Sequence, residues 1–440
     1  MLSQLKERIP TPLMQAYHYC MARFAVLWYR HPSERMIVIG VTGTKGKTTT
    51  SYFIAKAIEA TGAKVGCATT ALFKIADREW TNRAKMTMLG RFATQKLLRQ
   101  MVDAGCRYAV VETSSQGLIQ FRHIGINYDV AVFTNLTPEH IEAHGGFENY
   151  KKAKKILFSH MARSPRKIID GRRLEKVAVL NADSPHAEAF ANVPGLTRIE
   201  WFGREQPHGV TATDIRRGEW GSVFRTENLE VELNLPGAQN IENALAAVAV
   251  CKALNLPLEK AVRGIRSVDR LPGRFEKVDM GQPWTVLIDY AHEAASMTKL
   301  YETVEQMPHQ RIIHVFGSAG TPRDMGRRPM LGAIAGKRAD IMILTDEDPG
   351  DEESLTILEA IAKPARLDGK HEGENLFLIP DRHKAIAHAM RLAQEGDLVM
   401  ITGKGNEGLM LYAKGVKVPW DETAIVKEAI QKEMNENRSS

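Results

Sequence analysis

The chain has 440 residues, of which 44% are hydrophobic and 25% are charged. This length exceeds one ordinary hydrophobic core and the composition excludes wholesale disorder, so we expect two or three folded domains. Lys and Arg outnumber Asp and Glu by 59 to 52, and the net charge of +7 suits anionic ligands without identifying them. The four cysteines form no CxxC pair, which predicts reduced thiols in a cytoplasmic protein and argues against a zinc site or a disulfide framework.

The first predicted element is a helix within residues 13–29, a stretch rich in apolar and aromatic side chains. Gln15, His18 and Arg23 interrupt the stretch, and its longest apolar run, residues 24–29, is far shorter than the roughly 20 residues that a membrane span needs. We expect an amphipathic helix that packs on the body of the protein. The alternative is a helix that makes peripheral contact with a membrane face.

Short β-branched runs then alternate with helical patterns. They lie at residues 36–41, 107–111, 130–134 and 177–180, and again at 285–288, 312–316, 341–344, 376–379 and 398–401. Such alternation predicts an α/β fold with parallel sheets covered on both faces. Between the two series, residues 199–235 are typical of antiparallel strands and residues 240–253 of a helix. With a boundary at Leu271-Pro272-Gly273, we predict three parts, residues 1–35, 36–270 and 271–440.

Polar clusters follow the predicted strands at seven places: residues 43–49, 112–115, 135–140, 289–292, 317–324, 346–348 and 403–407. Ligands of open parallel sheets bind beyond the carboxyl ends of the strands. This repeated placement indicates an enzyme.

The first cluster is a glycine-rich loop between a predicted strand and a predicted helix. It reads Gly43, Thr44, Lys45, Gly46, Lys47, Thr48, Thr49. Glycines let backbone N–H groups approach phosphate oxygens, and the positive end of the helix points at them. Lys47 would meet the β- and γ-phosphates, and the two threonine hydroxyls suit phosphate and Mg²⁺. The loop is a shortened variant, because Val41 stands where the common pattern has its first glycine.

Glu112 and His140 follow two other predicted strands, and a carboxylate and an imidazole beside the loop could hold Mg²⁺. Taken singly each residue is a weak indication, since a lone strand-end histidine more often packs or forms a hydrogen bond. The lysines at 151, 152, 154 and 155 would by themselves indicate only a solvated basic helix face.

In this order, the segments resemble the Mur ligase family, most closely its MurE-type members. They comprise residues 41–50, 112–115, 134–136 with Glu139 and His140, 150–154, Asn240 with Asn243, 273–274, 289–292, 316–329 and 403–407. The resemblance implies a central P-loop ATPase domain with a mostly parallel sheet, and a C-terminal Rossmann-like domain. It implies ATP and Mg²⁺ as cofactors, a carboxylate activated as an acyl phosphate, and attack by the amine of an amino acid, in peptidoglycan precursor synthesis.

The resemblance also implies roles for individual residues. Catalysis falls to Lys47, His140 and Lys154. The ATP contacts are residues 43–49, Asn240, Arg274 and Asp289. The Mg²⁺ ligands are Thr48, Glu112, His140 and Lys154, the last as a carbamate, which turns a cation into a carboxylate-like ligand. The substrate contacts are Ser114, Ser115, Arg122, Arg323, Asp346, Glu347, Asp348, Gly403 and Glu407.

Two departures from the family concern the acceptor. Only 35 residues precede Met36, too few for the family's uridine-binding domain. We therefore expect the muramoyl-peptide acceptor to be held differently, supplied in another form, or bound with help from a partner protein. In addition, residues 85–88 read Lys-Met-Thr-Met where the family has a Thr-Thr-Pro element, and Lys85 could take a phosphate or carboxylate or lie free on the surface.

A third departure concerns the incoming amino acid. Diaminopimelate-adding members have Asp-Asn-Pro-Arg where this chain has residues 347–350, Glu-Asp-Pro-Gly, and Gly350 cannot pair with a distal carboxylate. The acidic residues 346–348 would attract a side-chain ammonium, which favours a lysine-like amino acid over meso-diaminopimelate. The alternative is that these acids cap the next helix, near residues 352–354.

Other functions remain open. Folylpolyglutamate synthetases, the MurT amidating subunit and the ligase half of cyanophycin synthetase share the core with another acceptor. A nucleic-acid-binding P-loop NTPase would explain the basic charge, but no basic stripe with interleaved aromatic residues is present, and we expect no nucleic-acid partner. Lys47, Glu112, His140 and Lys154 argue against a scaffold with dead catalysis.

Overall fold

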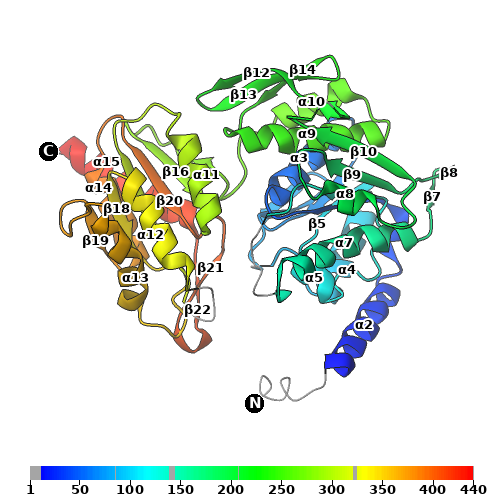
Figure 1. Ribbon diagram of the computed structural model, residues 1–440, viewed down its shortest axis with the longest axis horizontal. Coiled ribbons are helices and arrows are strands. Elements are labelled where there is room, and N and C mark those ends of the chain that lie inside the picture. Colours follow the sequence, from blue (N-terminus) through cyan, green and yellow to red (C-terminus); the bar gives the residue numbers. More distant parts are fainter. Residues whose placement is uncertain (1–10, 85, 138–143, 207, 321–324, 440) are drawn as a thin grey trace. The chain divides into compact units, whose positions relative to one another are not determined.

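The computed structural model describes residues 11–84, 86–137, 144–206, 208–320 and 325–439. The chain forms two compact units, Met1–Trp80 with Met86–Asp269, and Thr81–Lys85 with Arg270–Ser440 (Figure 1). His140 and Arg323, both predicted site residues, and Lys85 lie outside the described residues.

The first unit is built on a nine-stranded sheet in the order β11-β10-β9-β6-β1-β5-β2-β3-β4. Its strands are β1 (Ile37–Thr42), β2 (Val65–Ala68), β3 (Leu72–Ile75), β4 (Arg78–Thr81), β5 (Tyr108–Glu112), β6 (Val130–Phe133), β9 (Val177–Asn181), β10 (Arg198–Gly203) and β11 (Val210–Thr211). All neighbours from β11 to β2 run parallel, and β3 runs antiparallel to β2. The mostly parallel sheet predicted from the sequence is confirmed.

Helices cover both faces of this sheet. They are α2 (Thr11–Trp28), η1 (Pro32–Arg35), α3 (Lys47–Glu59), α4 (Arg91–Asp103), α5 (Ser115–Ile119), α7 (Phe147–Arg163), α8 (Ala187–Ala191), α9 (Ala238–Ala253) and α10 (Leu258–Arg266). Helices α3, α9 and α10 pack on one another, whereas apolar residues of α4, α7 and α8 share a core with β1, β5, β6 and β9. All six residues of β1 are buried, as expected for a strand covered on both sides.

The expectation of antiparallel strands over residues 199–235 was partly wrong. Strands β10 and β11 extend the parallel sheet, because Ile199 and Trp201 of β10 pack against the main core. Only the following strands, β12 (Thr213–Gly218), β13 (Gly221–Thr226) and β14 (Leu229–Leu233), form a separate antiparallel sheet. A short antiparallel ribbon, β7 (Ile168–Ile169) with β8 (Arg172–Arg173), completes the unit.

The second unit has a six-stranded sheet in the order β15-β16-β20-β17-β18-β19. The strands are β15 (Glu276–Lys277), β16 (Thr285–Asp289), β17 (Ile312–Phe316), β18 (Ile341–Leu344), β19 (Leu376–Leu378) and β20 (Leu398–Thr402), and only β15 runs antiparallel to its neighbour. The helices are α11 (Ala294–Val304), α12 (Arg327–Arg338), α13 (Ser354–Leu367), α14 (Arg382–Leu392) and α15 (Glu422–Ser439). Helices α11, α12 and α13 form one layer, and α14 packs with α15.

The remaining short elements of this unit are β21 (Leu409–Leu411), η2 (Ala413–Gly415) and β22 (Lys417–Pro419). β21 and β22 pair as an antiparallel ribbon, which follows the loop after β20.

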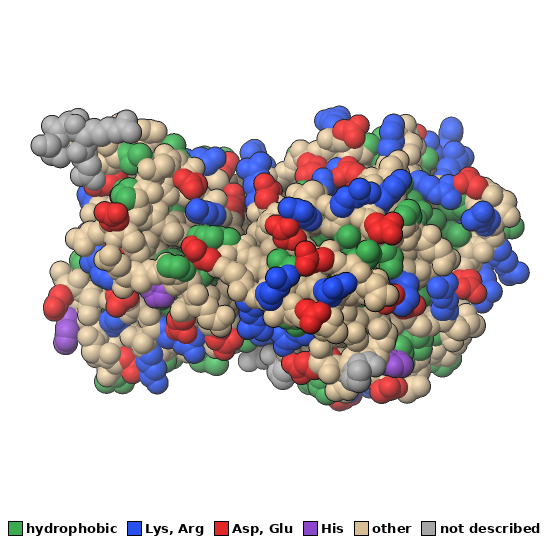
Figure 2. Space-filling model, turned by 90° about the horizontal axis from the view of Figure 1, so that it is seen from above, with side chains coloured by type: hydrophobic (Ala, Val, Ile, Leu, Met, Phe, Trp, Pro, Cys, Tyr) green, Lys and Arg blue, Asp and Glu red, His purple; other side chains and the backbone are tan. Residues whose placement is uncertain are grey.

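The surface carries charges of both signs. On the face shown in Figure 2, Lys and Arg side chains are interspersed with Asp and Glu side chains. Within the described residues, no helix combines the length and the apolar character needed to cross a membrane. The four cysteines are free, and three of them are buried.

Candidate functional site

The glycine-rich loop joins β1 to α3, as its sequence predicts, and two of its glycines are required by close neighbours. A Cβ on Gly43 would lie 1.9 Å from Thr134 Oγ1, and a Cβ on Gly46 would lie 2.4 Å from Asn243 Oδ1. Gly46 also has a φ of 79°, in the left-handed region that favours glycine. The loop is therefore clamped between the end of β6 and helix α9.

The residues after β6 hold this loop in place. Phe133 pairs with Thr42 in the sheet, which brings the next residues beside the loop. Asn135 Oδ1 accepts a hydrogen bond from Lys45 N at 2.8 Å, and Thr134 Oγ1 donates to Lys45 O at 2.7 Å. The amide of Thr44 also donates to the carbonyl oxygen of Asn135. These amides fix the loop rather than point at a ligand, so phosphate binding falls to the amides nearer the start of α3.

Thr48 and Glu112 meet at the first turn of α3. Glu112 ends β5 and pairs with Val41 of β1, so the register of the sheet sets its carboxylate next to the loop. Thr48 Oγ1 donates to Glu112 Oε2 at 2.9 Å. Thr70 adds its backbone N at 2.7 Å and its hydroxyl at 3.0 Å to the two carboxylate oxygens. Both Thr48 and Glu112 are buried.

Helix α7 presents two residues to the other side of the loop. Tyr150 and Lys154 are four residues apart and so share a face of the helix. Lys154 Nζ donates to Gly43 O at 2.6 Å and lies 4.3 Å from the centre of the Tyr150 ring. Tyr150 OH donates to Thr44 Oγ1 at 3.2 Å. Lys154 is almost fully buried, so the solvated basic face is a wrong interpretation for this lysine.

These groups fit Mg²⁺ in kind and in number. Hydroxyl and carboxylate oxygens are the ligands that this ion prefers, and it commonly takes only one or two protein carboxylates together with waters and phosphates. Among the described residues no three His, Cys, Asp or Glu side chains gather as a protein-built metal cage. The pair of Thr48 and Glu112 matches an ion that is carried in with a nucleotide.

Asn240 lies in the first turn of α9 and is one of two linked asparagines. Its Nδ2 donates to Pro236 O at 2.7 Å, and its Oδ1 accepts from Asn243 Nδ2 at 3.0 Å. Asn243 Oδ1 accepts from Thr50 Oγ1 at 3.0 Å. Asn240 therefore acts on the loop through Asn243, which our list of predicted site residues omitted.

Three predicted acceptor contacts lie near the start of α5. Ser114 caps this helix by accepting from Gly117 N at 3.1 Å, which suits an N-cap serine. Ser115 Oγ lies 3.2 Å from His144 Nε2. Arg122 donates through Nη1 to Met88 O, and burial lowers the pKa of its guanidinium.

In the second unit, Arg274 and Asp289 lie at the start of the unit and at the end of β16. Both carboxylate oxygens of Asp289 accept backbone hydrogen bonds, from Phe275 N at 2.7 Å and Ala291 N at 2.7 Å. Arg274 stacks on Tyr290, with 4.3 Å between the guanidinium carbon and the ring centre. Burial raises the pKa of Asp289, and the positive charge of Arg274 opposes that rise.

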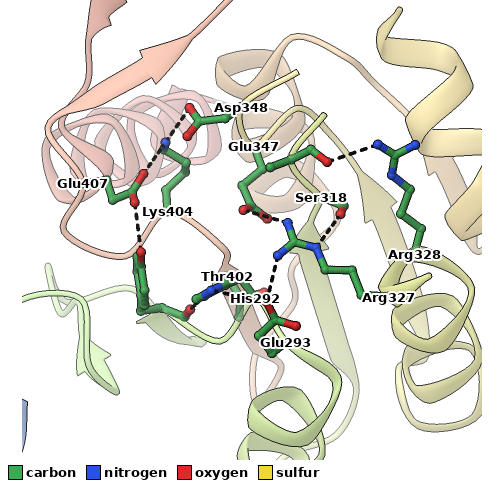
Figure 3. A network of polar contacts seen from close by, with 12 residues as sticks. His292, Glu293, Ser318, Arg327, Arg328, Glu347, Asp348, Thr402, Lys404 and Glu407 are labelled. Atoms are coloured by element: carbon green, nitrogen blue, oxygen red, sulfur yellow. Dashed lines mark hydrogen bonds and ion pairs between the residues drawn. The ribbon is translucent and has the colours of Figure 1, made fainter. Parts of the chain in front are cut away.

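The acidic residues after β18 have separate partners. Asp346 Oδ2 accepts from Ser354 Oγ at 3.0 Å, and burial raises the pKa of its carboxyl group. Glu347 Oε1 accepts from Arg327 at 3.4 Å, while its buried Oε2 has no hydrogen-bond partner. Asp348 Oδ1 accepts from Lys404 Nζ at 2.9 Å (Figure 3). The helix-cap interpretation of these acids was wrong, because α13 is capped by Glu353.

Residues after β20 complete this network. Lys404 Nζ donates to Glu407 Oε2 at 2.7 Å, and Tyr290 OH donates to Glu407 Oε1 at 2.9 Å (Figure 3). A Cβ on Gly403 would lie 3.0 Å from Glu347 Oε2, so Gly403 leaves the space in front of that oxygen. The structure thus brings Glu347, Gly403 and Glu407 into one region, as expected from parallel strand ends.

Two arginines in the first turn of α12 are held by carboxylates. Arg327 donates to Ser318 Oγ at 3.0 Å and to Glu293 Oε1 at 3.0 Å, besides its bond to Glu347. Arg328 forms a two-pronged ion pair with Glu352 at 2.6 and 2.8 Å. Both arginines are buried, so neither is a free surface charge.

Several contacts of this site were not predicted as site residues. Thr70, Thr134, Asn135, His144, Tyr150, Asn243, Arg327 and Lys404 all bond directly to predicted ones. Spacing was the available signal for Tyr150, four residues before Lys154, and for Asn243, three after Asn240. Thr70 had none, because it lies in a loop between two short strands.

Comparison with known proteins agrees with this architecture. Residues 41–251 match the Mur ligase middle domain, and residues 273–405 match the Mur ligase glutamate ligase domain. A UDP-N-acetylmuramyl-tripeptide synthetase of Roseiflexus sp. (strain RS-1) is 39% identical over 432 residues, which are 96% of this chain and 84% of that protein. A UDP-N-acetylmuramoyl-L-alanyl-D-glutamate--2,6-diaminopimelate ligase of Geobacillus kaustophilus is 36% identical over 428 residues, with the same coverage of 96% and 84%.

Solved structures show the same fold. A UDP-N-acetylmuramoyl-L-alanyl-D-glutamate--2,6-diaminopimelate ligase superposes with a TM-score of 0.60 at 28% identity, over 91% of this chain and 79% of that one. The folylpolyglutamate synthase of Mycobacterium tuberculosis, solved with ADP and AMPPCP, has a TM-score of 0.69 at 17% identity, over 88% and 92%, and shows the fold alone. The chain belongs to the Mur ligase family of ATP-dependent, ADP-forming amino-acid ligases.

Proposed function

We propose that this chain is a MurE-type ligase, which joins an amino acid to the carboxylate of a muramoyl-peptide acceptor. The observation that carries the proposal is the hydrogen-bonded pair of Thr48 and Glu112 beside the loop from Gly43 to Gly46, in a chain of this family. Relatives with 39% and 36% identity carry the names of tripeptide synthetase and diaminopimelate ligase, which supports this type of acceptor.

The reaction has two steps. An acceptor carboxylate oxygen attacks the γ-phosphorus of ATP, forming an acyl phosphate as ADP leaves. The amine of the amino acid then attacks the acyl carbon, and phosphate leaves as the amide forms. Phosphorylation is needed because an unmodified carboxylate oxygen is a poor leaving group. Both steps build negative charge, which cationic side chains and the N-terminus of α3 stabilise.

Lys47 is the cation that serves the phosphates in this proposal. Its Nζ donates to Thr44 O at 2.8 Å, within its own loop, so it has only to swing outward to meet a bound phosphate. Thr48 and Glu112, together with His140, hold Mg²⁺, which neutralises phosphate charge when it is bound. Lys154, once carbamylated, would contribute a third anionic ligand. Thr49, in the same turn, is proposed to contact phosphate.

The two units divide the work in this proposal. Residues 36–270 bind ATP, with Asn240 placed for the adenine, and residues 271–440 bind the amino acid and supply Arg274 and Asp289 to the nucleotide. The acceptor is contacted by Ser114, Ser115 and Arg122. Residues 1–35 serve as a packing helix, α2, whose free face is considered below.

We further propose that the amino acid carries a side-chain amine. Glu347 supports this, because its Oε2 is buried without a hydrogen-bond partner and faces the space left by Gly403. Asp348 is already countered by Lys404, so Glu347 is the acid with unused capacity. Gly350 has no side chain to pair with a second carboxylate. These features favour L-lysine over meso-diaminopimelate.

Turnover with defined substrates tests the activity. Phosphate release from ATP and Mg²⁺ should require both an amino acid and a muramoyl-peptide acceptor, with either omission reducing it to background. A panel of amino acids then tests the side chain: activity with L-lysine and none with meso-diaminopimelate is expected. The reverse preference would overturn the amine proposal and leave the ligase proposal intact.

The Glu347→Gln variant sharpens this test. Loss of the buried negative charge should raise KM for L-lysine by roughly tenfold to a hundredfold, the effect of losing one charge-assisted hydrogen bond, with KM for ATP unchanged. Glu374→Gln is the matched control on the exposed surface of the same unit. An unchanged KM for lysine would remove Glu347 from the amino-acid site.

An acceptor of another kind is the alternative. The Mycobacterium tuberculosis folylpolyglutamate synthase is matched over 92% of its length, against 79% for the diaminopimelate ligase structure. Turnover with a folate glutamate acceptor and none with any muramoyl peptide would select this alternative, along with the amidating and cyanophycin-type ligases.

A further inference from the structure

Helix α2 is apolar on two sides, and only one of them is used by the fold. Ala22, Ala25 and Val26 are buried against the rest of the unit. The fit is tight, because a Cβ on Gly125 would lie 1.8 Å from Val26 Cγ2. Phe24 also contacts Phe92 of α4, with 6.0 Å between the ring centres. The C-terminal half of the helix is therefore fixed to the unit, while its N-terminal part extends beyond the neighbouring helices (Figure 1).

The other side of α2 is an exposed apolar face. It consists of Leu13, Tyr17, Phe24, Leu27 and Trp28, with exposed fractions from 51% to 67%, and is called the α2 stripe. Steps of four, seven and three residues place these side chains along one line of a helix. A helix of 18 residues is about 27 Å long, so the α2 stripe is too extensive to be a scatter of single exposed residues.

The surroundings of the α2 stripe are basic. Thr11 to Trp28 includes no Asp or Glu, while Arg23 is exposed on the helix and Arg30 follows it. Beside the helix lie Arg91 and Arg122, whose printed hydrogen bonds go to Gln120 O, Met88 O and the sulfur of Met86 rather than to a carboxylate. Burial lowers the pKa of Arg91, and the nearby positive charge of Arg122 lowers it further.

We propose that the α2 stripe docks on an anionic lipid bilayer, with the helix lying in the plane of the surface. Tyr and Trp suit the interface, because they place an apolar ring and a polar tip at the same depth, and Arg23 and Arg30 meet lipid phosphates. Lying flat agrees with the finding that no described helix is long and apolar enough to cross a membrane.

Charge argues against a second copy of this chain as the occupant. Two copies of α2 packed through the stripe would bring Arg23 of each near the other, with no acidic residue in either helix to pair with it. An anionic surface removes this repulsion. This proposal goes beyond the ligase activity and does not depend on it.

Vesicle binding by the full chain tests the proposal. The purified protein is sedimented with vesicles of phosphatidylcholine alone and with vesicles of equal parts phosphatidylcholine and phosphatidylglycerol. Binding is expected only to the anionic vesicles, and to weaken as salt is raised. A double variant, Leu27→Gln with Trp28→Gln, should lose at least about tenfold in binding, since two large exposed apolar groups no longer enter the interface.

The controls separate this proposal from its rivals. Leu367→Gln, at a site that is 86% exposed on α13, removes an equally exposed apolar group and should leave binding unchanged. Arg23→Gln should weaken binding to anionic vesicles by a few-fold. Equal binding to neutral vesicles, or no loss in the double variant, would overturn the proposal. So would a dimer in light scattering that becomes a monomer in the double variant, because the occupant would then be a second copy.

Discussion

Thr48 and Glu112 are 64 positions apart in the sequence, and the hydroxyl of Thr48 donates to the Glu112 carboxylate at 2.9 Å. Parallel pairing of β1 with β5 creates this contact, because Val41 and Glu112 are register partners and the loop begins two residues after Val41. An oxygen-lined position beside the phosphate loop follows from sheet register alone.

Glu112→Gln should lower kcat by about a hundredfold or more, because a neutral amide cannot balance the charge of a bound cation. The concentration of Mg²⁺ for half-maximal activity should rise at the same time. Both are measured by phosphate release, with thermal unfolding as a check on folding. Glu148→Gln, on the exposed first turn of α7, is the matched control. Wild-type kcat and Mg²⁺ dependence in Glu112→Gln would rule out this role.

Lys154→Ala should nearly abolish turnover, with a loss of about a thousandfold, and added bicarbonate should not restore it, since no amine is left to carbamylate. Lys152→Ala, exposed on the same helix, should keep its activity. Carbon-13 NMR with labelled bicarbonate should show a carbamate signal in the wild type that Lys154→Ala lacks. Turnover of Lys154→Ala equal to that of Lys152→Ala would refute the proposed role.

Gly46→Ala should raise KM for ATP by at least about tenfold, because the new methyl group would meet Asn243 Oδ1 at 2.4 Å and shift the loop. Gly62→Ala is the matched comparison. Its φ of 97° imposes a similar backbone strain, yet nothing lies within 4 Å of its Cβ. It should lose about 1 kcal/mol of stability and no ATP affinity. Equal kinetic effects in the two variants would mean that strain alone, and not the contact with Asn243, matters.

Stability at acid pH should depend on His123. Burial lowers the pKa of this buried imidazole to about 3, with a further contribution from His160, whose ring centre is 4.9 Å away. An unfolded histidine titrates near 6.5, so below that pH the unfolded state binds a proton that the folded state refuses. The contribution of His123 to stability is complete above pH 6.5 and falls by about 1.4 kcal/mol per pH unit as pH drops towards 3.

The His123→Gln variant checks this slope. Urea unfolding between pH 7 and pH 4, a range that brackets the titration of an unfolded histidine, should give a shallower fall in the free energy of unfolding than in the wild type. His383→Gln is the control, because His383 is exposed. Parallel pH curves for wild type and His123→Gln would contradict the argument.

Local sequence was sufficient for the elements and for their chemistry. The alternation of apolar runs and helical patterns predicted β1, α3, β5, β6 and the five parallel strands of the second unit. The GKTT motif placed the loop between β1 and α3. These features are local, since they depend on side-chain periodicity and on the backbone freedom of glycine.

Tertiary structure alone decided which of these residues meet. Lys154 appeared within a run of lysines that would suit a solvated face, and packing of α7 beneath the loop buries it against Gly43. Asp346, Glu347 and Asp348 formed one acidic run in the sequence, and the fold gives each its own partner, leaving Glu347 with an unpaired oxygen. Such outcomes depend on strand register and on cationic neighbours far along the chain, such as Lys404 and Arg327. The sequence by itself therefore determined the elements, the loop and the family, because these depend on local pattern, whereas burial and pairing depend on how distant segments pack.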